Sequence, residues 1–407
     1  SNGRLDVLQW LMEGQLVSVV FLLPQAAAHG HMEMVRWIIE NNPSDQRELA
    51  VIVVTLAIHT AVIHGHLEMA KFLHEFAKNS RWMAGMTEAQ VMAIVLISPE
   101  TRKVSSETMI TATMRGFIDS VRWLYAEYGS NSATNIFECS ERQPGTIAMD
   151  VAAANGHLDV LKFLHELQVS GDNRVVCTKN AMDHAAANGH LNVVQWLHEN
   201  REEGCSTAAM DGAAGNGKLD VAQWLHENRT EGCTREAIDK ASMFGHLEVI
   251  KWLHVNRTEG CTNRSMDNAA MLGKLEVVKW LHFNRSEGCT QEAMDEAAAH
   301  GFLVVVKWLH INRTEGCTVR AMNGAAENGH LKVVQWLHAN RSEGCTTTAV
   351  NKAAAFGHFE VLLFLHFNCH IDCTEEVALR TLQNEHLDVH TWVLDRYPAY
   401  RDIVAGD

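Results

Sequence analysis

Cysteine, histidine and aspartate are the side chains of this sequence that could do chemistry, and each recurs at a fixed interval of 28 residues. A cysteine beside a histidine is a possible nucleophile, and sets of both residues bind zinc. The cysteines of the series are Cys177, Cys205, Cys233, Cys261, Cys289, Cys317, Cys345 and Cys373. The histidines are His198, His226, His254, His282, His310, His338 and His366, and the aspartates are Asp183, Asp211, Asp239, Asp267 and Asp295. An active site needs one specially tuned place, so this repetition indicates a structural role and we expect no catalytic residue.

The same spacing disfavours metal sites. Successive segments of a helical stack are separated by about one helix diameter, roughly 10 Å, so a column of cysteines cannot bring two sulfurs into bonding distance or surround one zinc ion. One cluster differs, because Cys369 and Cys373 are four residues apart with His366 and His370 nearby. A metal or redox protein that uses this cluster is the disfavoured alternative, since no zinc-ligand spacing is matched. We expect no metal and no cofactor.

Structural roles can be assigned to the polar columns instead. Buried polar groups are normally satisfied locally, so each aspartate is expected to accept hydrogen bonds from backbone amides of the neighbouring segment. Each histidine is expected to direct a ring nitrogen at a backbone group of the adjoining loop. The arginines of the loops, such as Arg285, are followed two residues later by a glutamate, such as Glu287. Local pairing of these charges is therefore predicted.

The elements that position these residues are two short helices and a loop in each segment. Thr262 is a suitable N-cap for the first helix, and Gly273 suits a left-handed turn before the second, which starts near Lys274. Isolated helices of fewer than about 12 to 15 residues are marginal in water. Stacking of neighbouring segments must supply the stability, which predicts an all-α solenoid.

The period divides the chain into three regions. Residues 1–176 are expected to form irregular repeats with insertions, with residues 1–12 as the second helix of an incomplete repeat. Seven regular repeats follow in residues 177–372, and a degenerate capping repeat in residues 373–407. The longest departures from the period run from Pro43 to Leu56, from Asn79 to Thr111 and from Tyr128 to Thr146. Because the sequence begins inside a repeat, the chain is expected to be a fragment of a longer protein.

Residues 153–164, which read Ala-Ala-Asn-Gly-His-Leu-Asp-Val-Leu-Lys-Phe-Leu, resemble the core of an ankyrin repeat. Two departures are a 28-residue period in place of about 33 and a Met-Asp pair in place of the family's Leu-His pair. The shorter loop implies that the β-hairpin fingers of the family are mostly lost. This short variety is similar to ankyrin expansions of oomycetes and giant viruses. The resemblance implies a protein-binding function.

Charge and hydropathy exclude other classes of partner. The chain carries 34 Lys and Arg against 49 Asp and Glu, a formal charge of −15, so nucleic acid is not expected as a partner. No apolar run is long enough to cross a bilayer, so no membrane association is expected. Free-looking cysteines in each repeat favour a reducing compartment, the cytoplasm, or a host cytosol if the protein is exported.

Positions that vary among the repeats predict where a protein partner binds. On the first helices these positions share one face, which we expect to line the concave side of the solenoid. The candidate binding residues are Glu236, Lys240, Met243, Phe244, Arg264, Asn268, Met271, Leu272, Glu292, Glu296 and His300. A second varying column on the second helices contains Glu199, Glu227, Val255, Phe283, Ile311, Ala339 and Phe367. The sequence thus predicts a non-catalytic interaction scaffold, with a substrate adaptor or a pathogen effector that targets a host protein as the alternative.

Overall fold

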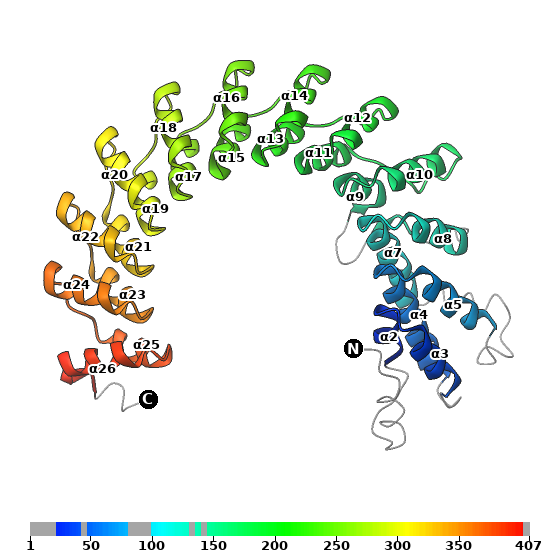
Figure 1. Cartoon of the computed structure of the whole chain (residues 1–407), viewed down its shortest axis with the longest axis horizontal. Helices are drawn as coiled ribbons and strands as arrows, with labels where there is room; N and C mark the ends of the chain where they lie inside the picture. The colour runs from blue at the N-terminus through cyan, green and yellow to red at the C-terminus, as the bar shows by residue number, and fades with distance from the viewer. Residues whose placement is uncertain (1–21, 42–46, 80–98, 130–134, 140–144, 402–407) are drawn as a thin grey trace. The chain divides into compact units, whose positions relative to one another are not determined.

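The computed structural model describes residues 22–41, 47–79, 99–129, 135–139 and 145–401. The chain forms two compact units, an N-terminal unit of Ser1–Ser206 and a C-terminal unit of Thr207–Asp407. Each unit is a stack of helix pairs (Figure 1). The expected helix at residues 1–12 lies outside the described residues.

The N-terminal unit contains repeats of unequal length. Its first helices are α2 (Leu23–Ala28), α4 (Arg47–Ile63), α7 (Pro99–Met114), α9 (Ala148–Ala154) and α11 (Lys179–Asn188). Its second helices are α3 (Met32–Glu40), α5 (Leu67–Asn79), α8 (Ile118–Tyr128), α10 (Leu158–Val169) and α12 (Leu191–Asn200). The helices α4 and α7 have 17 and 16 residues, so part of the extra sequence before each turn is taken up as helix.

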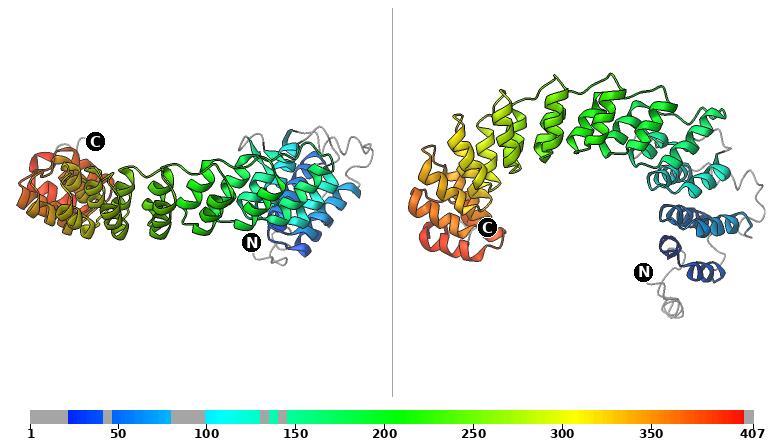
Figure 2. Two further views of the ribbon diagram at one scale, coloured as in Figure 1. Left: turned by 90° about the horizontal axis from the view of Figure 1, so that it is seen from above. Right: turned by 45° about the horizontal axis from the view of Figure 1, so that its top comes forward.

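The C-terminal unit repeats one pattern seven times. Its first helices are α13 (Thr207–Gly215), α15 (Glu236–Phe244), α17 (Arg264–Met271), α19 (Glu292–Ala299), α21 (Val319–Glu327), α23 (Thr347–Ala355) and α25 (Glu376–Gln383). Its second helices are α14 (Leu219–Asn228), α16 (Leu247–Asn256), α18 (Leu275–Asn284), α20 (Leu303–Asn312), α22 (Leu331–Asn340), α24 (Phe359–Cys369) and α26 (Leu387–Arg396). Within this unit the first helices form the inner row of a curve and the second helices the outer row (Figures 1 and 2).

Local sequence explains where the first helix of a repeat begins and ends. Asn263 directly precedes α17, and the Oγ1 of the predicted capping residue, Thr262, accepts a hydrogen bond at 3.2 Å from the backbone N–H of Arg264, the first residue of the helix. The chain leaves this helix through Gly273, whose φ of 69° is left-handed. A Cβ on Gly273 would also lie 2.5 Å from the ring of Phe302 in the next repeat. Glycine is therefore required both by the backbone and by the close packing of repeats.

The core lies between the two rows of helices. In the repeat of α17 and α18 it is formed by Ala269 and Ala270 from the first helix and by Val277, Val278 and Leu281 from the second, all buried. The small alanines let adjacent first helices approach closely, and the aliphatic side chains fill the space behind them. Burial of such residues against neighbouring repeats stabilises helices that are too short to be stable alone.

The last repeat departs from the pattern at its turn. Glu385 occupies the place of the turn glycine and keeps the left-handed conformation, with a φ of 60°. A short 3-10 helix, η3 (Pro398–Tyr400), follows α26, and the hydroxyl of Tyr400 donates to the carbonyl of Cys373 at 2.9 Å. This hydrogen bond holds η3 against the start of the last repeat.

Strands are nearly absent from the part of the chain that the structure describes. The two present are β1 (Glu138–Cys139) and β2 (Thr146–Ile147), which pair antiparallel with Glu138 opposite Ile147 and Cys139 opposite Thr146. The all-α solenoid with few β-hairpin fingers is thereby confirmed. Among the described helices, none combines the length and the apolar character that crossing a bilayer requires.

Candidate functional site

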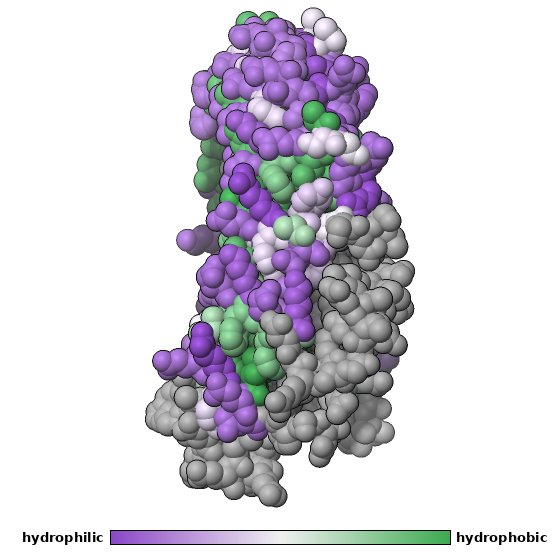
Figure 3. Space-filling model, turned by 90° about the vertical axis from the view of Figure 1, so that its right-hand side faces the viewer, coloured by the Kyte–Doolittle hydropathy of each residue, from purple (hydrophilic) through white to green (hydrophobic). Residues whose placement is uncertain are grey.

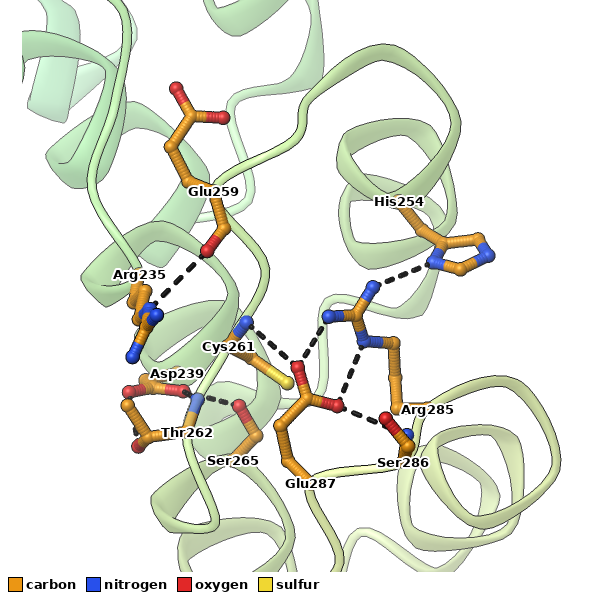
Figure 4. A network of polar contacts seen from close by, with 10 residues as sticks. All are labelled: Arg235, Asp239, His254, Glu259, Cys261, Thr262, Ser265, Arg285, Ser286 and Glu287. Carbon is orange, nitrogen blue, oxygen red and sulfur yellow. Dashed lines mark hydrogen bonds and ion pairs between the residues drawn. The ribbon is translucent and has the colours of Figure 1, made fainter.

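The aspartate column forms one set of connections between repeats. Asp239 in α15 is buried, and its Oδ1 accepts a hydrogen bond from the backbone N–H of Thr262 at 2.9 Å (Figure 4). Its Oδ2 accepts from the hydroxyl of Thr262 at 2.7 Å, and its carboxylate also accepts from the hydroxyl of Ser265. The predicted aspartate-to-backbone hydrogen bond is confirmed, and the hydroxyl of the N-cap threonine adds a second bond. This carboxylate is used by the fold and is not positioned as a catalytic base.

The same bridge recurs along both units. The pairs are Asp150 with Thr178, Asp183 with Ser206, Asp211 with Thr234, Asp267 with Thr290 and Asp295 with Thr318. Asn323 and Asn351 take over the role toward Thr346 and Thr374. Burial raises the pKa of Asp211 and of Asp267, against hydrogen bonds from the threonines that lower it. A neutral amide can therefore substitute for the carboxylate.

A second connection joins the loop of one repeat to the second helix of the previous one. The guanidinium of Arg285 donates through Nε to Glu287 Oε2 at 3.2 Å, and its Nη1 lies 3.2 Å from Nδ1 of His254 (Figure 4). The imidazole of His254 also packs edge-on against Trp280, with ring centroids 5.2 Å apart. We call this arrangement of arginine, glutamate, histidine and tryptophan the clasp. Because a guanidinium only donates, Nδ1 of His254 is the acceptor in this contact.

Equivalent contacts occur at other junctions. An arginine pairs with the glutamate two residues on at Arg201, Arg229, Arg257, Arg285, Arg313 and Arg341. Contacts from arginine Nη1 to histidine Nδ1 join Arg201 to His165, Arg257 to His226, Arg313 to His282 and Arg341 to His310. The predicted arginine–glutamate pairing is confirmed. The expected contact of histidine with a loop backbone group is wrong at these positions. There Nδ1 of the ring contacts the arginine side chain of the next repeat instead.

Three junctions use another side chain at the arginine position, twelve residues after the turn. Tyr128 lies 3.0 Å from His74, Cys369 lies 3.5 Å from His338, and Tyr397 lies 3.4 Å from His366, each measured to Nδ1. Sequence reasoning missed these substitutes. Their position relative to the turn is the signal that finds them, since tyrosine and cysteine can donate a hydrogen bond as arginine does.

Electrostatics in the clasp keep its glutamate ionised. Burial would raise the pKa of Glu287, but hydrogen bonds from Arg285 and from backbone N–H groups outweigh it and lower the pKa to about 2. The Cys261 N–H is one of these donors, at 3.4 Å from Glu287 Oε1 (Figure 4). The loop arginines are thus engaged inside the protein rather than presented as a row of phosphate-binding groups.

The thiols of the cysteine column have raised pKa values, whereas a nucleophilic cysteine has a lowered one. Burial raises the pKa of Cys289 and of Cys345 to about 12, and that of Cys317 to about 11. At neutral pH the reactive thiolate form is therefore scarce. These thiols serve as small side chains near the end of each loop, shortly before the first helix of the next repeat.

The four residues of the suspected metal cluster are not brought together. Cys369 faces His338, whereas His366 contacts Tyr397 and Arg396. His370 is exposed at the end of α24. Across the described ranges, no group of three or more histidine, cysteine, aspartate or glutamate side chains is arranged to hold a metal ion.

The predicted binding residues lie on α15, α17, α19 and their turns, on the inner row of the C-terminal unit. None of them is buried, and Phe244 is 49% exposed. Glu236 pairs with Lys240 at 3.0 Å, and Glu296 pairs with Arg320 at 3.3 Å. The four apolar members come from two adjacent repeats: Met243, Phe244, Met271 and Leu272. We call these four residues the inner patch.

The second varying column lies on the outer row of the same unit. Val255, Phe283 and Ile311 are 79%, 74% and 78% exposed, respectively. The loops that the structure describes therefore do not shield these three residues. Figure 3 shows a different face, the right-hand side of the view in Figure 1. Its coloured atoms are mostly hydrophilic, and hydrophobic residues lie in narrow areas between them.

Comparison with known proteins places the repeats in a family. A family model described as ankyrin repeats (many copies) matches residues 23–74, 149–198, 206–254, 266–310 and 318–366, more than half of the chain. No curated protein matches the chain.

Proposed function

Because this chain belongs to the ankyrin-repeat family, whose repeats are generally protein–protein interaction modules, we propose that it is a non-catalytic scaffold that binds a protein partner through the inner patch. Ankyrin-repeat proteins are typically not enzymes. The side chains that could do chemistry here are engaged in connections between repeats, as the Asp239 and Arg285 contacts illustrate.

The observation that carries the proposal is the composition of the inner patch. Two methionines, a leucine and a half-exposed phenylalanine from adjacent repeats are accessible on one row of helices. Methionine adapts to different partner shapes, and large apolar side chains supply most of the binding free energy in protein interfaces. A patch of this kind favours a protein surface or segment with its own apolar anchors.

Charged residues around the inner patch favour recognition of an acidic group beside those anchors. The exposed side chain of Arg264 makes no ion pair within the described residues, and Asn268 lies one turn further along the same helix. The nearby Glu236 and Lys240 neutralise each other. Arg264 is therefore a positive charge left available to a partner, and its guanidinium can bind a carboxylate in a bidentate manner.

The test is an affinity capture with the full chain as bait, read by quantitative mass spectrometry. A variant with Met243→Ser, Phe244→Ala, Met271→Ser and Leu272→Ala should lose at least about 90% of a specific partner, because about 1.4 kcal/mol of lost binding free energy lowers affinity tenfold. A partner retained by this variant would place the binding surface elsewhere.

Phe356 offers a matched control. It occupies the position equivalent to Phe244 in a later repeat, and the two rings are 48% and 49% exposed. Phe356→Ala should therefore capture the same partner as the wild-type chain. Equal loss of the partner in both variants would indicate a general effect of removing an exposed aromatic ring rather than a site at the inner patch.

A further inference from the structure

The outer row of the C-terminal unit carries apolar side chains where the fold does not need them. The position of Val255, Phe283 and Ile311 is occupied by Glu227 in α14, which is also exposed. Stacking therefore tolerates a charged residue at this position. Three large apolar side chains at the same position of successive repeats remain 74% to 79% exposed, which the stacking of the repeats does not explain.

The helix α20 differs from its neighbours in charge as well. In α16 and α18 the outer face carries an ion pair three residues apart, Lys251 with Glu248 and Lys279 with Glu276, each at 2.8 Å. In α20 the glutamate is replaced by Val304, which is 65% exposed. This replacement enlarges the apolar surface, and it removes the ion-pair partner that Lys307, three residues further on, would have had.

Two lysines are left without acidic partners beside this surface. Lys307 in α20 and Lys332 at the start of α22 are both exposed, and neither makes an ion pair among the residues that the structure describes. Their charge contrasts with the formal charge of −15 for the whole chain. A local positive charge next to an apolar column is complementary to a segment that is apolar on one side and acidic on the adjoining side.

We propose that this outer column, formed by Val255, Phe283, Val304 and Ile311, is a second docking surface that binds an acidic amphipathic helix of a partner protein. Packed helices lie about 10 Å apart, and seven residues of an α-helix rise about 10.5 Å. A bound helix that crosses the repeats therefore places apolar residues seven positions apart against Val255, Phe283 and Ile311 in turn. Acidic residues on its adjoining stripe face the two lysines.

The central anchor of this surface is held in place by the clasp. The ring of Phe283 packs edge-on against its neighbour His282, with ring centroids 4.8 Å apart. His282 is in turn fixed by Arg313 Nη1 at 3.4 Å and by the ring of Trp308. A side chain whose position is already restricted loses less conformational entropy on binding.

Charge also separates this partner from the other possible occupants. An anionic bilayer would be repelled by a chain with 49 acidic and 34 basic residues. A second copy of the chain in a two-fold symmetric contact would bring Lys307 and Lys332 toward the same lysines of its neighbour, and like charges at an interface are unfavourable. An acidic helix is small enough to contact only the local surface around Lys307 and Lys332, and it brings no copies of these lysines.

The experiment is a fluorescence anisotropy titration of the full chain with a labelled synthetic helix of about 18 residues that carries leucines seven positions apart and glutamates on the adjoining stripe. The expected result is saturable binding that weakens as salt rises. Val304→Glu, which recreates the ion-pair pattern of α16 and α18, and Ile311→Ser should each weaken binding at least tenfold. Phe356→Ala, on the inner row, should bind as the wild type does.

Several results would overturn the proposal. One is an absence of saturation up to about 1 mM peptide. Another is unchanged affinity in both outer variants when circular dichroism shows that they are folded. A third is binding of a scrambled or lysine-striped peptide that is as tight as binding of the acidic one. Sedimentation that shows self-association lost in Ile311→Ser, or binding to phosphatidylserine vesicles without binding to the peptide, would identify a different occupant and also overturn it. None of these outcomes depends on the inner patch.

Discussion

The two units contain the same kind of repeat, but the first junctions of the N-terminal unit are connected differently from those of the C-terminal unit. In the C-terminal unit, one bridge from aspartate or asparagine to threonine recurs from α13 to the start of the last repeat, and one clasp recurs beside it. In the N-terminal unit, the junction of α2 with α4 instead uses Thr60, whose hydroxyl donates to the carbonyl of Pro24 at 3.1 Å. At the junction of α4 with α7, His59 contacts Thr108 at 2.6 Å.

What both units retain is the turn and the small, aliphatic core. Gly30, Gly65 and Gly116 are left-handed in the N-terminal unit, as Gly273 is in the C-terminal unit. Ala57 and Ala61 are buried in the long helix α4, as Ala269 and Ala270 are in α17. The comparison teaches that the glycine turn and the alanine packing define the repeat, whereas the polar bridges are interchangeable ways of joining one repeat to the next.

Removing an aspartate bridge should have the largest effect on stability. Asp267 is buried and accepts hydrogen bonds from the backbone N–H of Thr290 at 2.8 Å and from its hydroxyl at 2.9 Å. Asp267→Ala leaves two donors unsatisfied and should destabilise the C-terminal unit by about 2 to 3 kcal/mol. Asp267→Asn should cost less, because Asn323 makes the same bridge to Thr346. Urea unfolding followed by tryptophan fluorescence measures both, and equal midpoints for the two variants would contradict this account.

Breaking a clasp in each unit tests whether the two versions are equivalent. Arg285→Ala removes the contacts to Glu287 and His254, and it should cost about 1 to 2 kcal/mol. Tyr128→Phe removes only the hydroxyl that reaches His74, and it should cost about 1 kcal/mol or less. Thermal melting of both variants provides the measurement. A Tyr128→Phe effect larger than that of Arg285→Ala would reverse the comparison.

Acid should weaken the N-terminal clasp. Burial lowers the pKa of His74, against a hydrogen bond that its Nε2 donates to Glu127, which raises the pKa. The unfolded chain therefore binds a proton at a higher pH than the folded chain does. The stability that neutral His74 contributes is complete above the ordinary histidine pKa of about 6.5 and is lost as the pH falls below it. Denaturation midpoints measured from pH 7.5 to 5 should fall less steeply in His74→Gln than in the wild type, and parallel curves would exclude this histidine as the cause.

The smallest expected effect is a gain at the last turn. Glu385 holds a φ of 60° where the other turns of the C-terminal unit have glycine. Glu385→Gly relieves that strain, and the greater freedom of glycine in the unfolded chain offsets part of the gain, leaving a stabilisation of about 0.5 to 1 kcal/mol. Gly357→Ala, one repeat earlier, is the matched control and should destabilise, since its Cβ would lie 2.6 Å from His386. A lower melting temperature for Glu385→Gly would contradict the assignment of strain.

The sequence was sufficient to predict contacts that form within a single repeat. The cap at Thr262, the turn at Gly273 and the pairing of Arg285 with Glu287 each join residues a few positions apart, and all three are present. The aspartate bridge was also predicted, because a buried carboxylate at a fixed place needs a donor nearby.

Contacts that depend on how one repeat sits on the next were harder to predict. The histidine partner was assigned to a backbone group, since nothing within a single repeat shows that Arg285 reaches back to His254. The extended helices α4 and α7 could not be read from the period, because the additional residues there break it. The candidate binding residues were placed on an accessible face, but accessibility alone does not identify a binding site.

The most direct test of the scaffold proposal is hydroxyl-radical footprinting of the chain alone and with its captured partner. Methionine oxidises readily, so the inner patch contains its own probes in Met243 and Met271. The account predicts that the partner protects Met243, Phe244 and Met271, whereas Phe356, equally exposed in the free chain, is oxidised as before. Protection of Phe356 with unchanged oxidation of the two methionines would contradict the central claim that the inner patch binds the partner.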